Sequence, residues 1–137
     1  MVSRSFQRTL SSLSSIFAFI DEVLAARHPD AETSLEIHLA VDEIVTNMVT
    51  HQPAGAETLE VALECRGGRL IIRLVDNGVE PFDVTAAPDP DFQEEASRRR
   101  PGGLGIYLAR QVMSAVRYEY DERCRRSELI MEKVLEA

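Results

Sequence analysis

The apolar positions in the first fifty residues follow the 3.6-residue period of two amphipathic helices. The first helix is expected to start near Ser11 and to end near Pro29, because proline cannot continue a helix. Its inward positions are expected to be Leu13, Ile16, Phe17, Ile20, Val23 and Leu24. The second helix is expected from about Glu32 to Thr50, with a buried stripe at Ile37, Val41, Ile44 and Met48. A short strand over Ser3 to Thr9 is expected ahead of both helices.

The pattern then changes to the two-residue alternation that is typical of strands. The alternating apolar residues are Leu59, Val61, Leu63 and Cys65 in a first run, and Leu70, Ile72 and Leu74 in a second. Gly67 and Gly68 separate the two runs, and such a pair favours a tight turn. The segment therefore predicts a β-hairpin.

No regular pattern continues from Asn77 to Pro101, a stretch rich in Pro, Asp and Glu with at most one helical turn, in "DFQEEA". Loops of this length are uncommon in small domains and are usually functional, so a lid or binding loop is expected at about 79–101. A helix follows to about Ser114, with inward positions Ile106, Ala109, Val112 and Met113. The strands "AVRYEYD" and "SELIMEKVL" then pair through a turn at about Arg123 to Arg126.

The order β-α-α-β-β-loop-α-β-β predicts an α/β (α+β) two-layer sandwich. Its sheet is expected to be mixed and mostly antiparallel, with the three helices packed on one face. The 137 residues suit one domain over 1–137, and they show no internal repeat.

Composition excludes several classes of function. The chain has 15 Lys and Arg against 23 Asp and Glu, a net charge of -8, which disfavours direct binding of nucleic acid and makes a positively charged protein partner easier to accommodate. No apolar run approaches the roughly 20 residues of a membrane span, and the N-terminus has no signal-peptide pattern. Cys65 and Cys124 form no CxxC pair, which argues against a disulfide framework and a zinc site. A cytoplasmic protein without membrane contact is expected.

Candidate chemistry begins on the second helix, where Glu43, Asn47 and His51 follow one another at intervals of four residues. At about 100° per residue they form one stripe beside the buried one, on the rim of the core. Taken alone, such a stripe is more often the exposed polar face of an amphipathic helix. A histidine at a helix end is likewise more often a structural hydrogen-bonding residue than a catalyst.

Two further motifs are also weak when taken alone. Asp76 ends an apolar strand and is followed by Gly78, where a turn can require a positive φ. The stretch "RRRPGGLGIYLARQV" places Gly102, Gly103 and Gly105 at a helix start, directly after the arginines at 98–100. This pattern fits a plain helix start, and it also fits a backbone that approaches an anion closely.

Together, Glu-x-x-x-Asn on a helix, Asp-x-Gly after a strand and Gly-Gly-Leu-Gly opening a helix resemble the Bergerat-type ATP-binding superfamily of gyrase B, MutL and the histidine-kinase catalytic domains. Within it, the short length and the segments "DEIVTNMVTHQ", "VDNGVEPFD", "RPGGLGIYLARQVMSAVRYEY" and "SELIMEKVL" resemble the bacterial anti-sigma-factor serine kinases. The resemblance covers nearly the whole chain and implies the Bergerat ATP-binding fold.

The resemblance implies a role for each motif residue. Asn47 would bind Mg²⁺, Glu43 would be the general base, and Asp76 would accept a hydrogen bond from the adenine amino group. Gly78 would let the backbone close under the base. ATP phosphates would meet backbone N–H groups of the glycine motif, and the remaining nucleotide-site candidates are Gly102, Gly103, Leu104, Gly105, Arg100 and Ser127.

The implied activity is that of a serine/threonine protein kinase which uses Mg-ATP, phosphorylates a small antagonist protein of the STAS type and sequesters a sigma factor. The resemblance also implies a homodimer. An alternative is a catalytically silent ATP-binding module that regulates a partner by nucleotide-dependent contact, and a third is an accidental match of motifs. Glu80 stands where the superfamily often has a second glycine after Asp76, and the absence of a phosphoacceptor helix argues against a complete histidine kinase.

Overall fold

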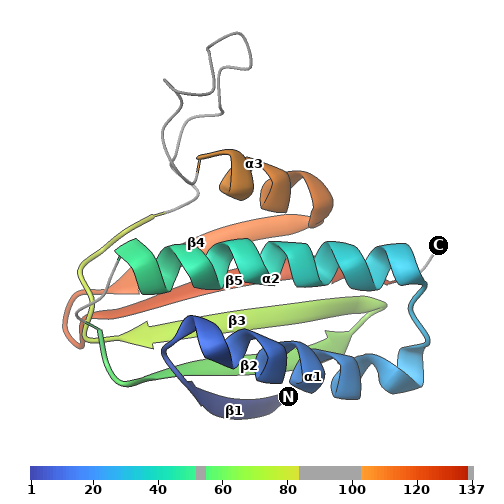
Figure 1. The fold of residues 1–137 in the computed structure, drawn as a ribbon, viewed down its shortest axis with the longest axis horizontal. Helices are drawn as coiled ribbons and strands as arrows, with labels where there is room; N and C mark the ends of the chain where they lie inside the picture. The colour runs from blue at the N-terminus through green and yellow to red at the C-terminus, as the bar shows by residue number, and fades with distance from the viewer. Residues whose placement is uncertain (52–54, 84–102, 136–137) are drawn as a thin grey trace, which may run out of the picture.

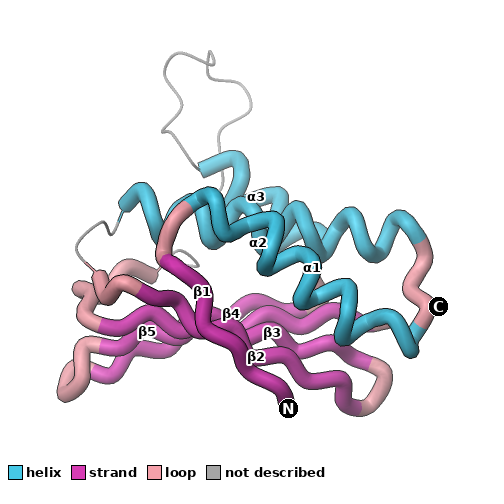
Figure 2. The backbone as a smooth tube through the Cα atoms, turned by 60° about the horizontal axis from the view of Figure 1, so that its bottom comes forward, coloured by secondary structure: helices cyan, strands magenta, loops and turns pink. Residues whose placement is uncertain are grey.

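A computed structural model of the chain describes residues 1–51, 55–83 and 103–135, which form a helical layer on one face of a sheet (Figure 1). Figure 2 shows the two layers from the side, with the helices all on the same face. The predicted two-layer sandwich is confirmed. Among the described residues, no helix combines the length and apolar composition needed to cross a bilayer.

The sheet has five strands in the order β1-β2-β3-β5-β4, and every neighbouring pair is antiparallel. The strands are β1 (Val2–Gln7), β2 (Thr58–Arg66), β3 (Arg69–Asn77), β4 (Ala115–Asp121) and β5 (Arg126–Val134). The prediction of a mixed sheet is therefore corrected to a fully antiparallel one. The predicted hairpin is confirmed, because Gly67 and Gly68 both have positive φ at the turn between β2 and β3.

The helices are α1 (Leu13–Leu24), α2 (Ala31–His51) and α3 (Gly103–Val112), with short 3₁₀ turns at Leu10–Ser12 and Ala25–Arg27. The first predicted helix is thus an α-helix as far as Leu24, and the 3₁₀ turn continues it to Arg27, close to the expected end near Pro29. His28 ends the 3₁₀ turn after α1 in the left-handed region, with a φ of 49°. Because Pro29 disfavours the right-handed helical region for the residue before it, the helical turns do not continue through His28.

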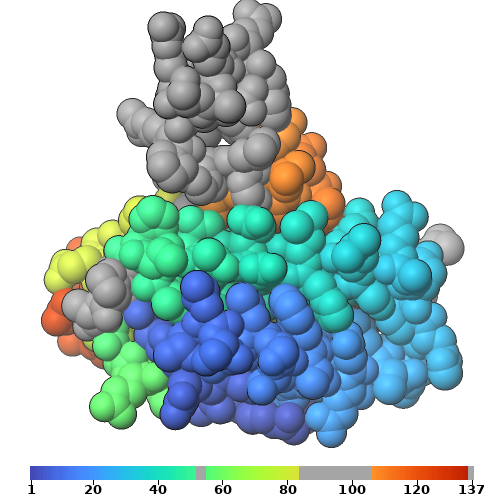
Figure 3. Space-filling model, viewed as in Figure 1, coloured from blue at the N-terminus to red at the C-terminus, as the bar shows by residue number. Residues whose placement is uncertain are grey.

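The core lies between the helices and the inner face of the sheet. The predicted stripe of α2 is buried in full, as are the alternating residues of β2 and β3 except the partly buried Cys65. In the space-filling view, α1 and α2 meet along a continuous seam (Figure 3). At that seam His38 of α2 stacks on Phe17 of α1, with ring centroids 4.6 Å apart, and its Nε2 lies 2.7 Å from a carboxylate oxygen of Asp21.

Candidate functional site

A small cavity lies between the C-terminal half of α2 and the ends of β3, β4 and β5. Its volume is about 20 Å³, which holds about one water molecule. Two of the candidate residues, Asp76 and Ser127, line it, and their strands pair at this position. The other lining residues are Ile44, Met48, Val79, Glu80, Phe82, Tyr118 and Leu129.

Asp76 is 1% exposed, and its carboxylate is paired with Arg8. Arg8 Nε donates to Asp76 Oδ1 at 2.7 Å, and a terminal nitrogen of the same guanidinium donates to Oδ2 at 2.8 Å. That terminal nitrogen also donates to the carbonyl of Met48 near the end of α2, at 2.9 Å. Because a buried carboxylate is costly without a partner, this ion pair allows Asp76 to remain charged in the wall of the cavity.

Two glycines shape the backbone beside this ion pair. A Cβ added to Gly55 would lie 2.9 Å from both the Arg8 guanidinium carbon and Val79, so the loop after α2 closes directly over Arg8. Gly78 has a φ of 71°, and the Ala56 N–H donates to the Asn77 carbonyl just before it. The prediction that Gly78 requires a positive φ is confirmed.

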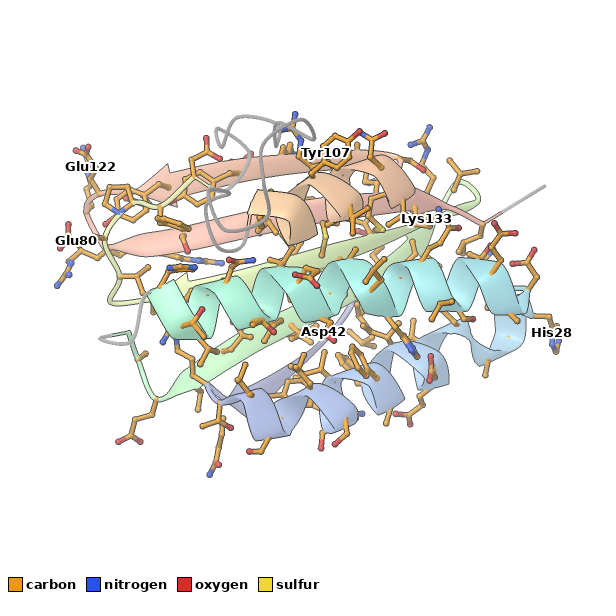
Figure 4. The ribbon with its side chains drawn as sticks, turned by 45° about the horizontal axis from the view of Figure 1, so that its top comes forward. His28, Asp42, Glu80, Tyr107, Glu122 and Lys133 are labelled. Atoms are coloured by element: carbon orange, nitrogen blue, oxygen red, sulfur yellow. The ribbon has the colours of Figure 1, made fainter. Side chains whose placement is uncertain are left out.

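The chain continues as a strap, residues 78–83, that lies against the ends of β4 and β5. Tyr120 donates its hydroxyl proton to the Val79 carbonyl at 2.7 Å, and the Val79 N–H donates to the Arg125 carbonyl at 3.2 Å. Arg125 also pairs with Glu80 at 2.8 Å. Figure 4 shows Glu80 at the same end of the sheet as Glu122, which lies in the β4–β5 turn.

Aromatic side chains hold the far end of the strap. The Phe82 N–H donates to the Tyr118 hydroxyl oxygen at 2.9 Å, and the Phe82 ring stacks on His51 with centroids 5.6 Å apart. Burial raises the pKa of the Tyr118 hydroxyl above its ordinary value of 10.0, against a smaller opposite effect of the Phe82 N–H. The strap thus closes over a cavity that it helps to line.

Glu43 and Asn47 lie on the stripe of α2 next to Ile44 and Met48, and neither lines the cavity. Asn47 is 6% exposed, and its Nδ2 donates to the Glu43 carbonyl at 2.6 Å. This bond fixes the amide orientation and leaves Asn47 Oδ1 without a hydrogen-bond partner in the described part of the chain. The Glu43 carboxylate is half-buried and makes no ion pair with any residue that the structure describes.

The glycine motif is only partly described. Gly103, Leu104 and Gly105 form the first turn of α3, so the predicted helix start is confirmed. Gly102, Arg100 with its two neighbouring arginines, and the lid beyond residue 83 lie outside the described residues. His51, the last residue of the predicted stripe, is exposed and contacts the strap through Phe82.

Sequence reasoning missed Arg8 and the two tyrosines of β4. Tyr118 and Tyr120 alternate with charged residues in "AVRYEYD", and that alternation already indicated that both face the inner side of the sheet. Arg8 carries no such signal, because it follows a short edge strand and its partner is 68 residues away.

A family model described as "Histidine kinase-like ATPase domain" matches residues 6–133. Serine-protein kinase RsbW of Listeria monocytogenes is 34% identical over 93 residues, 64% of this chain and 59% of the relative. Serine/threonine-protein kinase BtrW of Bordetella bronchiseptica is 28% identical over 91 residues, 65% of this chain and 63% of the relative. The matches thus span about three fifths of the length of these curated relatives.

Among solved structures, the RsbU and RsbW domains of a Mycobacterium tuberculosis protein align with a TM-score of 0.68 at 17% identity, covering 98% of this chain and 31% of that one. The histidine kinase domain of a blue-light-activated kinase from Erythrobacter litoralis aligns with a TM-score of 0.53 at 14% identity, covering 95% of this chain and 62% of that one. At these identities the likeness bears on the fold alone.

Proposed function

The chain belongs to the histidine kinase-like ATPase domain family, and we propose that it is a serine/threonine protein kinase that uses Mg-ATP. The observation that carries the proposal is the cavity at the end of β3, with the buried carboxylate of Asp76 in its wall. The relatives named as serine-protein or serine/threonine-protein kinases support the reaction class.

In the proposed complex, the adenine base occupies the cavity and its amino group donates to Asp76. A carboxylate has about four lone-pair sites, and Arg8 uses two of them, so acceptor capacity remains on the cavity side. The cavity is too small for a purine as it stands. We therefore propose that the 78–83 strap moves away from Tyr118 and His51 when the nucleotide enters, because these contacts hold it closed.

The residues of α2 fit a magnesium ion bound mainly by phosphate and water. The free Asn47 Oδ1 is a buried amide oxygen, a ligand type that Mg²⁺ accepts, and no cluster of three His, Cys, Asp or Glu side chains suited to a metal occurs among the described residues. Among the residues that the structure describes, Asn47 would be the ligand that holds the ion. The ion would neutralise charge on the transferred phosphoryl group.

Glu43 lies one helical turn before Asn47 and is proposed as the general base. Within the described ranges its carboxylate has no competing ion pair, which leaves it able to accept the proton of a substrate hydroxyl. The hydroxyl oxygen then forms a bond to the γ-phosphorus of ATP while the bond to ADP breaks. The N-terminus of α3 at Gly103 would stabilise the phosphates through the backbone N–H groups of its first turn, with Gly102 and Arg100 as further candidates.

The proposed protein substrate is a small STAS-type antagonist of an anti-sigma factor, and the proposed partner of the unmodified chain is a sigma factor. This assignment rests on the resemblance to anti-sigma-factor serine kinases together with the RsbW relatives. The net charge of -8 favours partners that present a basic surface.

A phosphate-transfer assay tests the proposal. The purified chain is incubated with γ-labelled ATP, Mg²⁺ and a STAS-type antagonist from the same genome, in wild-type form and as Glu43→Gln. Asp42→Asn is the matched control, because Asp42 is the neighbouring carboxylate of α2 and is bonded to Thr46. We expect transfer by wild type and control, with a loss of 10²-fold or more in Glu43→Gln. Equal transfer by all three proteins would exclude Glu43 as the base, and nucleotide-dependent capture without transfer would favour a silent binding module.

A further inference from the structure

Arg8 has no place among the motif residues, yet its side chain is 5% exposed and all of its described contacts lie at the candidate site. It follows the edge strand β1 and reaches across the start of β2 to the end of β3. Its own N–H donates to the Glu57 carbonyl at 2.9 Å, which ties the backbone of Arg8 to the segment leading into β2. The residue is thus held at both its backbone and its guanidinium.

Asp76 separates Arg8 from the cavity. Arg8 is not one of the described residues that line the cavity, whereas Asp76 and the adjacent Ser127 of β5 are. In the sheet, β2 lies on the Arg8 side of Asp76 and β5 lies on the cavity side. Arg8 therefore supports the carboxylate from behind and does not occupy the space that a ligand would enter.

The guanidinium fixes Asp76 in two ways. A bidentate arginine pair sets the plane of the carboxylate as well as its position, which a single hydrogen bond does not. The third bond, to Met48 at 2.9 Å, connects the pair to α2, and Gly55 packs against the guanidinium from the loop after that helix. The carboxylate plane is thereby set by three separate parts of the chain.

We infer that Arg8 is a positioning residue for base recognition: it holds Asp76 charged and oriented, so that the free lone pairs of the carboxylate select a purine with an amino group at C6. This role rests on the proposed function. Lysine cannot replace Arg8 fully, because an ammonium group does not form the two parallel bonds of a guanidinium.

Dissociation constants for two nucleotides test the inference. ATP is compared with purine riboside triphosphate, which lacks the 6-amino group, on wild type, Arg8→Gln and Arg8→Lys. Because both nucleotides are measured on the same preparation, the folded fraction cancels from the ratio of the two constants. Arg73→Gln is the matched control, since Arg73 pairs with Glu128 at 3.1 Å on the opposite face of the sheet.

Wild type and Arg73→Gln are expected to prefer ATP by about tenfold to a hundredfold, the range for a hydrogen bond to a charged group. The preference should fall to about threefold or less in Arg8→Gln and to an intermediate value in Arg8→Lys. If Arg8→Gln weakens both nucleotides equally and keeps the wild-type ratio, Arg8 is only structural and the inference is overturned. If wild type binds ATP without preference, Asp76 does not recognise the amino group and the role of Arg8 is overturned. If wild type binds neither nucleotide, the proposed function itself is wrong, and this role is lost with it.

Discussion

Replacing one residue of the buried Arg8–Asp76 ion pair should lower the free energy of unfolding more than replacing a residue of a solvent-exposed ion pair. We consider Arg8→Met in the absence of nucleotide. The two side chains are 5% and 2% exposed and share two short hydrogen bonds, so the change leaves a charged carboxylate buried without its partner. Removing one member of a buried pair typically costs about 3–5 kcal/mol.

That cost is large enough to measure by heat or denaturant. The entropy of unfolding near the midpoint is about 2.1 cal/mol/K per residue, which for 137 residues is about 0.3 kcal/mol/K. A loss of 3–5 kcal/mol therefore lowers the melting temperature by about 10–17 °C. The comparison is Arg73→Met, whose pair with Glu128 is 30% and 20% exposed and should contribute about 1 kcal/mol or less.

The assay is urea unfolding at pH 7 followed by circular dichroism, with calorimetry on the same proteins. Asp76→Asn and the double variant Arg8→Met/Asp76→Asn complete a cycle. The loss of unfolding free energy in the double variant should be smaller than the sum of the two single losses by at least about 1 kcal/mol. The reason is that the second change removes the charge that the first left unpaired. Additive losses, or an Arg8→Met effect no larger than that of Arg73→Met, would refute a strong buried ion pair.

Three further changes test other parts of the structure. Hydrogen bonds from the Thr33 hydroxyl and N–H lower the pKa of Asp30 below its ordinary value of 3.8. The charged carboxylate therefore stabilises the folded state above pH 3.8, and this contribution is lost as the pH falls. Asp30→Ala should lower the melting temperature at about pH 7 and leave it unchanged near about pH 2. Lys133 is 13% exposed and donates to the last carbonyl of α3 at Val112, so Lys133→Met should cost about 1–2 kcal/mol in urea unfolding, and no change would contradict this capping role (Figure 4). Tyr118→Phe removes the hydroxyl oxygen that accepts the hydrogen bond from the Phe82 N–H of the strap. Nucleotide association measured by stopped flow should then be roughly fivefold faster, and an unchanged rate would mean that the strap does not gate the cavity.

The elements with a strong hydrophobic periodicity were predictable because the spacing of apolar residues within each element already defines its buried face. The stripe of α2 and the alternation of β2 and β3 require a single buried side wherever the element is placed, so local spacing is sufficient. The left-handed backbone of His28 was not predictable, because it depends on how the chain turns into α2. The strand directions likewise depend on pairing over long distances, of β1 with β2 and of β3 with β5.

The candidate site divides in the same way. Asn47, Asp76 and the glycines at the start of α3 could be named as candidates from the sequence because each belongs to a short motif. The strap contacts and Arg8 were not predicted, because they join residues from separate strands, loops and α2 that are far apart in the sequence. A lone arginine after a strand is ordinary in sequence, and it becomes informative when its guanidinium lies 2.7 Å from a buried carboxylate.

The sequence by itself determined the order of elements, the buried faces and the set of motif residues, since these follow from spacing and from the chemistry of single side chains. Only the tertiary structure decided that the sheet is fully antiparallel, that the cavity is closed by the strap, and that Asp76 is supported by Arg8. The physical reason is distance along the chain: burial of a helix or strand face is a local property, whereas a buried charge is stabilised by whichever opposite charge the fold brings to it.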